Sequence, residues 1–153
     1  MADFPSLAAQ SPIDVGIALL DAITANDAKS MEVLMDDDFI WRLCPTALGV
    51  REKNKRQYLL QSAELSRIFA SLEVHLRTPI NIVQSEKAVA VQVLCEGELA
   101  TGAPHHAECV MIFECRDGRV TRMTEFHDSE AIRKALDAGD GAGWKLLDKE
   151  WEE

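Results

Sequence analysis

A carboxylate and an imidazole lie two residues apart near the C-terminal end of the sequence, at Glu125 and His127. They belong to the second of two strand-like segments that meet at Asp117-Gly118, and Asp-Gly between such segments predicts a β-hairpin. Because side chains alternate across a strand, one face should carry Thr121, Met123, Glu125 and His127. If this face is inward, the protein has an acid/base pair in apolar surroundings. If it is outward, the pair only decorates a sheet surface.

Glu125 is the first candidate for catalysis, because a carboxyl group buried among apolar side chains can donate or accept a proton near neutral pH. The structural alternative is a strand glutamate paired with an arginine such as Arg122. His127 could hold or relay a proton with Glu125, but its position at the strand end favours the rim of a pocket. Asp128 is better explained as a cap for the following helix.

Trp41 and Arg42 lie on opposite faces of a short predicted strand, Phe39–Pro45. A shift of one residue decides which of them points inward. An inward Arg42 would pair with Glu125 and anchor a carbonyl or enolate oxygen. An inward Trp41 would form a platform for a flat or terpenoid ligand. The sequence leaves both alternatives open.

Further candidates lie on a predicted strand that includes Ala107–Cys115 and on a predicted helix. Alternation places His105 with Ala107, Cys109 and Met111, so His105 would lie at the mouth of a pocket; a polar loop is the alternative. Tyr58 could donate its hydroxyl group into the pocket or simply line the core. The expected pocket-lining residues are Trp41, Tyr58, Phe113, Met123 and His127.

The composition is that of one globular domain, with 153 residues, 47% hydrophobic and 27% charged. A net charge of −10 argues against nucleic acid and anionic membranes as partners. No apolar run is long enough to span a membrane, and the N-terminus lacks the pattern of a secretory signal, so we expect a cytoplasmic protein. The cysteines should be buried, reduced thiols: Cys44, Cys95, Cys109 and Cys115. His105-His106 alone does not supply zinc-ligand spacing, and we expect no metal and no cofactor.

Helical patterns fill the first half of the chain. Ser11-Pro12 starts one helix, with Ile13, Ile17, Leu20 and Thr24 as its apolar stripe. A second, short helix follows Asn26 or Asp27 and is closed by Asp36–Asp38. A longer helix should cover residues 52–69, where apolar residues recur at helical spacing.

Strand-like segments follow at Glu73–Val83, Ala88–Leu99, Ala107–Cys115 and Val120–His127. Their short connections predict an antiparallel meander. A helix should then run from Ser129 to Leu136, before a glycine-rich linker and a Trp-containing tail. The predicted organisation is an arm over 1–11, a domain over 12–137, and a linker with a docked or free tail over 138–153. Helices before strands indicate an α+β fold with helices on one face of a curved sheet.

Three local patterns resemble the nuclear-transport-factor-2-like superfamily, and within it the SnoaL-like polyketide cyclases, over residues 12–137. They are Asp37–Trp41 running to Pro45, Gly49–Arg51, and Asp117–Val120 running to Asp128. The resemblance implies a cone-shaped α+β fold with helices enclosing a pocket. The same fold hosts ketosteroid isomerases, limonene epoxide hydrolases, scytalone dehydratases and plain binding modules, so it does not assign a reaction.

Differences from these relatives narrow the chemistry. The epoxide hydrolases have a catalytic acid seven residues after the turn glycine, which corresponds to Glu125 and implies that it points inward. Their arginine has no counterpart in Ala88–Leu99, which offers only Glu96 and Glu98. Cys44 stands where ketosteroid isomerases have their general base. The single tyrosine of this chain provides at best part of the scytalone dehydratase set.

Together, these features predict a cofactor-independent enzyme acting on an apolar polyketide-like or terpenoid-like substrate. The reaction would be an isomerisation, cyclisation, rearrangement or dehydration, with Glu125 as acid/base and Arg42 or His105 orienting an oxygen. The alternative is a non-catalytic ligand-binding or protein-interaction module of the same fold. The resemblance also implies a homodimer formed through the outer face of the sheet.

Overall fold

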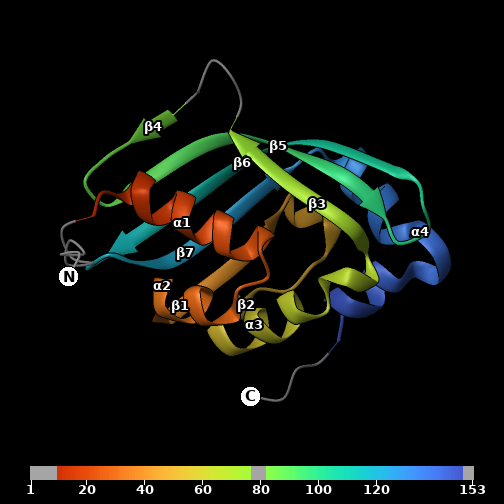
Figure 1. The fold of residues 1–153 in the computed structure, drawn as a ribbon, viewed down its shortest axis with the longest axis horizontal. Coiled ribbons are helices and arrows are strands. Elements are labelled where there is room, and N and C mark those ends of the chain that lie inside the picture. Colours follow the sequence, from red (N-terminus) through yellow and green to blue (C-terminus); the bar gives the residue numbers. More distant parts are fainter. Residues whose placement is uncertain (1–9, 77–81, 150–153) are drawn as a thin grey trace.

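The structure is a computed structural model and describes residues 10–76 and 82–149. A seven-stranded sheet has the order β2-β1-β7-β6-β5-β3, and β4 also pairs with β5 (Figure 1). Its strands are β1 Met35–Cys44, β2 Lys53–Asn54, β3 Phe69–Leu76, β4 Ile82–Gln84, β5 Ala88–Leu99, β6 Pro104–Arg116 and β7 Arg119–His127. The α-helices are α1 Pro12–Thr24, α2 Ala28–Leu34, α3 Lys55–Ala63 and α4 Ser129–Leu147. The predicted α+β class and cone-shaped fold are confirmed.

The meander of β5, β6 and β7 is antiparallel, as the sequence predicts, but the sheet as a whole is mixed. β1 lies parallel to β7, with Trp41 opposite Met123 and Leu43 opposite Glu125. Short-range signals could not reveal this pairing, because the two strands are far apart in the sequence. The predicted strand 73–83 corresponds to β3 and β4, and residues 77–81 between them lie outside the described residues.

An irregularity in the β6–β7 ladder changes which side chains of β7 point inward. Cys115 lies opposite Val120 and Glu114 opposite Arg122, so Thr121 is the extra residue of a bulge. Val120 is fully buried, whereas the Thr121 hydroxyl donates to the Glu114 carbonyl at 3.1 Å. The prediction that Thr121 shares the inner face was therefore wrong at the turn, although the alternation holds beyond it.

α1 begins where the sequence predicts. Ser11 is the N-cap, Pro12 is the first helical residue, and the Ser11 hydroxyl donates to Asp14 at 2.7 Å. Its buried face differs from the predicted stripe and consists of Pro12, Val15, Gly16, Leu19, Leu20 and Ala22. α1 crosses in front of the sheet in Figure 1 and contacts β3, β5, β6 and β7.

α2 is the short helix that the sequence predicts, whereas α3 is shorter than predicted. Asp27 caps α2, but Asp36–Asp38 belong to β1, where Arg116 pairs with Asp36 at 2.9 Å and with Asp38 at 3.2 Å. These ion pairs offset the poor strand propensity of an acidic run. Asn54 and Gln57 form a capping box that starts α3, and a 3₁₀ turn at Leu65–Arg67 precedes β3.

α4 consists of two helical segments with a non-helical stretch within the predicted glycine-rich linker. Asp128 is its N-cap, as the sequence predicts, and accepts hydrogen bonds from the backbone N–H groups of Glu130 and Ala131. Ala138–Gly141 have non-helical backbone angles, and the second helical segment packs back on the domain, with Leu146 and Leu147 buried. Trp151 of the predicted tail lies outside the described residues.

The four thiols are free, with Cys44, Cys95 and Cys109 buried and Cys115 partly buried. Among the helices of the described chain, none has the length and apolar character needed to cross a membrane.

Candidate active site

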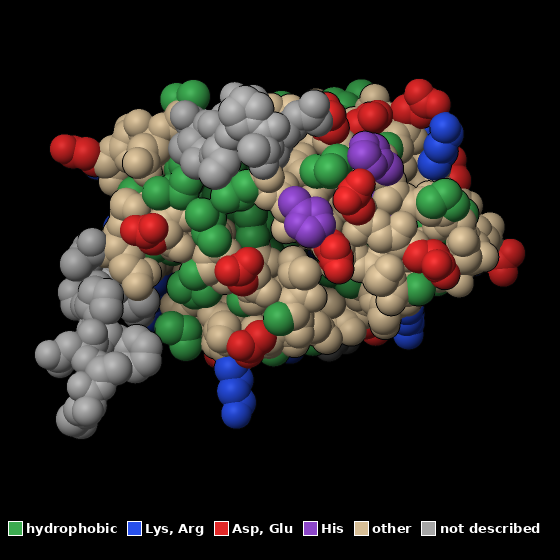
Figure 2. All heavy atoms as spheres, turned by 45° about the horizontal axis from the view of Figure 1, so that its top comes forward, with side chains coloured by type: hydrophobic (Ala, Val, Ile, Leu, Met, Phe, Trp, Pro, Cys, Tyr) green, Lys and Arg blue, Asp and Glu red, His purple; other side chains and the backbone are tan. Residues whose placement is uncertain are grey.

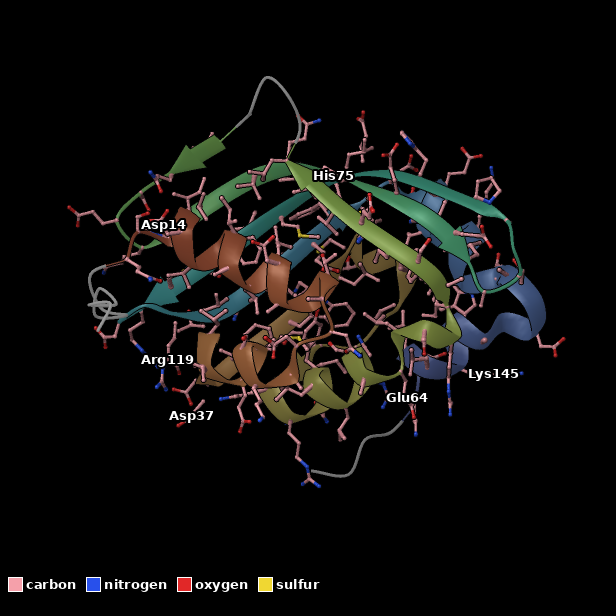
Figure 3. The ribbon with its side chains drawn as sticks, in the orientation of Figure 1. Asp14, Asp37, Glu64, His75, Arg119 and Lys145 are labelled. Atoms are coloured by element: carbon pink, nitrogen blue, oxygen red, sulfur yellow. The ribbon has the colours of Figure 1, made fainter. Side chains whose placement is uncertain are left out.

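A cavity of about 100 Å³ lies between the inner face of the sheet and helices α1, α3 and α4. Most of its wall is apolar, with Trp41 and Leu43 contributed by β1. The polar side chains in the wall are Tyr58, Gln61, Ser62, His105, Glu125 and His127. Charged residues labelled in Figure 3, such as Asp14, Asp37 and Lys145, lie at the periphery of the molecule instead. The cavity is therefore an apolar compartment with a few enclosed polar groups.

Glu125 and His127 lie side by side in this wall, both on β7. The His127 Nε2 atom is 3.6 Å from the Glu125 Oε2 atom, and the side chains are only 9% and 14% exposed, respectively. Burial by itself would lower the pKa of His127, but the Glu125 carboxylate outweighs burial and raises this pKa above its usual value. The pair thus combines a carboxylate with an imidazole that binds its proton more tightly than a free histidine does. His127 lies in the cavity wall, whereas the sequence favoured the rim.

Tyr58 reaches the cavity from α3. Its ring packs against Trp41 and Phe39, with ring centroids 5.5 Å and 5.6 Å apart, respectively. Burial, together with the negative charge of Glu125, raises the pKa of Tyr58. The phenol therefore stays protonated over the physiological pH range and can donate a hydrogen bond.

His105 lies on the inner face of β6, in the alternation predicted with Ala107, Cys109 and Met111. It lines both the cavity and a neighbouring surface depression. The imidazole ring contacts Phe69 edge-on, with ring centroids 5.0 Å apart. Burial and the nearby charges of His127 and His106 lower the pKa of His105, so it is neutral at pH 7.

The structure resolves the alternatives for the first strand. Trp41 and Leu43 line the cavity, because they lie beside Met123 and Glu125 of β7. Arg42 points to the outer face, where its Nη2 atom is 2.6 Å from Glu52 Oε1. The expectation that Arg42 could pair with Glu125 is therefore corrected.

Phe113 and Met123 are fully buried and lie opposite each other on β6 and β7. They belong to the core beneath α1, where a Cβ atom on Gly16 would be 2.8 Å from the Phe113 ring, and not to the cavity wall. Alternation identified their face correctly but not their position along the sheet.

Sequence reasoning missed Gln61 and Ser62, which are buried and line the cavity from α3. Both lie one helical turn after Tyr58, so their spacing could have indicated a shared face. Four buried polar atoms of cavity-lining residues have no hydrogen-bond partner among the described residues: Trp41 Nε1, Gln61 Oε1, Ser62 Oγ and His127 Nδ1.

A surface depression of about 250 Å³ adjoins the cavity and shares part of its wall. The shared residues are Ile23, Ser62, Leu65, Phe69 and Leu72. They surround the end of α1 and the start of β3. Figure 2 shows apolar side chains exposed among acidic ones on the face that turns forward from the top of Figure 1. This side is the natural entrance for an apolar ligand.

No group of three or more His, Cys, Asp or Glu side chains within 10–76 and 82–149 is arranged to hold a metal ion. The enclosed polar groups can exchange a proton and donate hydrogen bonds.

Known structures share this architecture. PrhC from Penicillium brasilianum NBRC 6234 is similar with a TM-score of 0.77 and 19% identity, over 88% of this chain and 94% of that one. BvnE pinacolase from Penicillium brevicompactum is similar with a TM-score of 0.72 and 18% identity, over 80% of this chain and 89% of that one. An LEH-like epoxide hydrolase from M. tuberculosis is similar with a TM-score of 0.66 and 18% identity, over 82% of this chain and 88% of that one. At these identities the likeness establishes the fold alone.

A search of curated protein sequences gives no significant match. Residues 17–123, however, match the SnoaL-like domain. This match covers most of the chain and agrees with the arrangement of the sheet and its helices. The chain therefore belongs to the SnoaL-like domain family and has the nuclear-transport-factor-2-like fold.

Proposed function

We propose that this protein is a cofactor-independent enzyme that moves a proton on a small, apolar molecule. The reaction class is an isomerisation, cyclisation, rearrangement or dehydration. The observation that carries this proposal is the Glu125–His127 pair, whose side chains lie 3.6 Å apart in the wall of an apolar cavity. A positioned acid/base pair of this kind contributes about 10²–10⁴-fold to a reaction rate.

Each polar group has a role in this proposal. Glu125 removes a proton from the substrate as general base. His127, kept protonated by its neighbour, returns a proton at a second position. Tyr58 donates a hydrogen bond to the oxygen that gains negative charge, because its hydroxyl stays protonated in the cavity. His105, neutral at pH 7, orients the substrate where the cavity meets the surface.

The pinacolase and the epoxide hydrolase among the similar structures support an enzymatic role for this fold. Their own reactions are not transferred, since fold alone does not fix chemistry.

A ligand-binding module without catalysis is the second candidate. Ligand pockets commonly measure about 300–1,000 Å³, whereas this cavity measures about 100 Å³. So small a cavity either takes a small ligand or is extended by the adjoining depression.

We also propose that the protein forms a homodimer through the outer face of the sheet. Val110 and Phe126 lie opposite each other on this face and are 39% and 47% exposed. The ion pairs Arg42–Glu52 and Arg122–Glu114 lie on the same face, giving the apolar centre and polar rim of an interface. Phe126→Lys should convert a dimer to a monomer in analytical ultracentrifugation, and an unchanged mass would reject this interface.

The enzymatic proposal is tested by incubating purified protein with a metabolite extract of its host, beside the Glu125→Gln variant, and comparing products by mass spectrometry. A product made by the wild type and lost in the folded variant supports the enzyme and identifies its substrate. Equal product profiles would favour the binding module.

A further inference from the structure

We infer that the cavity binds a small, neutral, mostly apolar molecule with two polar groups, an accepting oxygen held by Trp41 and a hydroxyl held by Gln61. The inference rests on the proposed function, because the same cavity holds Glu125 and His127. It adds the class of ligand and the two side chains that orient it.

Trp41 provides a fixed hydrogen-bond donor. Its side chain is 3% exposed, and its Nε1 atom has no protein partner among the described residues. An indole N–H can only donate, and buried N–H groups are normally paired. The ring is held against Tyr58, with centroids 5.5 Å apart, so the donor direction is set before a ligand arrives. An oxygen such as a ketone carbonyl satisfies this group.

Gln61 provides the complementary acceptor. It is 3% exposed on α3, and its Oε1 atom likewise lacks a protein partner among the described residues. Glutamine is mostly found exposed, so a buried glutamine in a cavity wall needs an explanation. The capping box at Asn54 fixes the start of α3, and with it the direction of this side chain. A hydroxyl group of the ligand would satisfy the amide oxygen.

The rest of the wall decides the ligand's charge and size. Leu20, Ile23, Ile68, Met111 and Leu136 make the surroundings apolar. Glu125 and His127 balance each other, so no unpaired charge among the lining residues would compensate a charged ligand. An apolar cavity of about 150 Å³ holds one benzene ring. This cavity is smaller, at about 100 Å³, but it shares wall residues with the depression of about 250 Å³. The size limit is therefore a single oxygenated six-membered ring that reaches from the cavity into the depression.

The test uses three probes that share one six-membered ring: cyclohexanone, cyclohexanol and 4-hydroxycyclohexanone. Each is titrated by NMR into the wild type, Trp41→Phe and Gln61→Leu. We expect the hydroxyketone to bind the wild type about tenfold tighter than the ketone. Trp41→Phe should weaken the ketone about tenfold, whereas Gln61→Leu should weaken the hydroxyketone and spare the ketone. Arg42→Gln on the outer face is the control and should change no affinity. Affinities within twofold across all variants, or no binding of any probe, would overturn the inference.

A second readout is made on the wild-type protein. The indole N–H resonance of Trp41, assigned with Trp144→Phe and Trp151→Phe, should move downfield when cyclohexanone is added to the wild type. An unmoved resonance at saturation would also overturn the inference.

The two proposals fail separately. If the probes bind as expected but Glu125→Gln leaves product formation unchanged, the proposed binding site is supported and the proposed proton-transfer function is rejected. If product formation still depends on Glu125 while Trp41→Phe and Gln61→Leu bind every probe like the wild type, the proposed function is supported. The proposed roles of Trp41 and Gln61 in holding the ligand are then rejected.

Discussion

Lys53 and Leu147 are joined by a buried hydrogen bond of 2.8 Å, in which the lysine ammonium group donates to the leucine carbonyl. Lys53 lies on β2 opposite Trp41, and Leu147 lines the cavity. Burial, aided by the charge of Arg51, lowers the pKa of Lys53. One hydrogen bond thus ties the last turn of α4 to the edge of the sheet that carries the cavity tryptophan.

Replacing this lysine should loosen the end of α4. Lys53→Met keeps the apolar stem but leaves the Leu147 carbonyl without its donor, so we expect a loss of about 1–3 kcal/mol in the free energy of unfolding. Amide hydrogen exchange should accelerate in residues 142–147. Lys134→Met removes an exposed pair with Glu130 and serves as the control, with a change of about 0.5 kcal/mol or less. Equal exchange in both variants would contradict the role of Lys53.

Glu125→Gln should abolish most turnover while preserving the fold. The amide keeps the size of the side chain but cannot accept the substrate proton, so the rate of product formation should fall about 10²–10⁴-fold. Glu114→Gln alters an exposed glutamate that pairs with Arg122 at 3.4 Å, and it should retain the wild-type rate. A rate reduced equally in both variants would point to a general effect of lost charge.

The stabilising effect of His127 should fade in alkaline solution. Its pKa is raised in the folded protein, so the folded state binds the proton more tightly than the unfolded state. This contribution is complete below the unfolded pKa of about 6.5 and disappears as the pH rises through the folded value. The gap in unfolding free energy between wild type and His127→Asn, from urea titrations, should therefore narrow from pH 6 to pH 9. A gap that widens would refute this assignment.

His105 should affect the pH dependence of stability in the opposite way to His127. Its pKa is lowered by burial, so the unfolded state takes up the proton first as the solution is acidified. Stability should then fall as the pH drops below about 6.5. His105→Gln has no titrating group and should lose less stability than the wild type between pH 7 and pH 5. Parallel curves for the two proteins would show that His105 does not titrate with unfolding.

Gly143 is required by the close contact between the two halves of α4. A Cβ atom there would lie 2.7 Å from the Cα atom of Leu136, a backbone atom that cannot rotate away. Gly143→Ala should therefore destabilise the protein by about 1–3 kcal/mol in thermal or urea unfolding, despite the better helix propensity of alanine. Lys145→Ala, at an exposed position nearby, should change stability by about 0.5 kcal/mol or less. A stabilised Gly143→Ala variant would mean that the contact relaxes easily.

The fold could be predicted wherever neighbouring residues determine the structure. The Asp-Gly turn and the alternation on β5 and β6 are local, and the structure has Ala88–Leu99 as predicted. The parallel pairing of β1 with β7 depends on distant contacts, so no local pattern indicated it. A docked tail was one of the alternatives that the sequence left open, and the second half of α4 packs on the domain.

The same distinction applies to the site. Alternation correctly grouped Glu125 with His127 and His105 with Met111, and the resemblance to the epoxide hydrolases implied that Glu125 points inward. Neither could decide between Trp41 and Arg42, because the register against β7 decides this. Gln61 escaped notice because polar helix residues are usually exposed. Its burial follows from the orientation of α3, which only the packed structure reveals.

The pairing of β1 with β7 also determines when the protein can fold. β1 leaves the ribosome early, but its long neighbour in the sheet, which carries Glu125 and His127, is among the last elements to be made (Figure 1). Closing so long a loop is entropically costly, and non-local pairings slow folding. During synthesis, the apolar side chains Trp41 and Leu43 therefore lack their neighbours on β7 until that strand has been made. A chain truncated before β7 would lose the acid/base pair and the continuity of the sheet in one step.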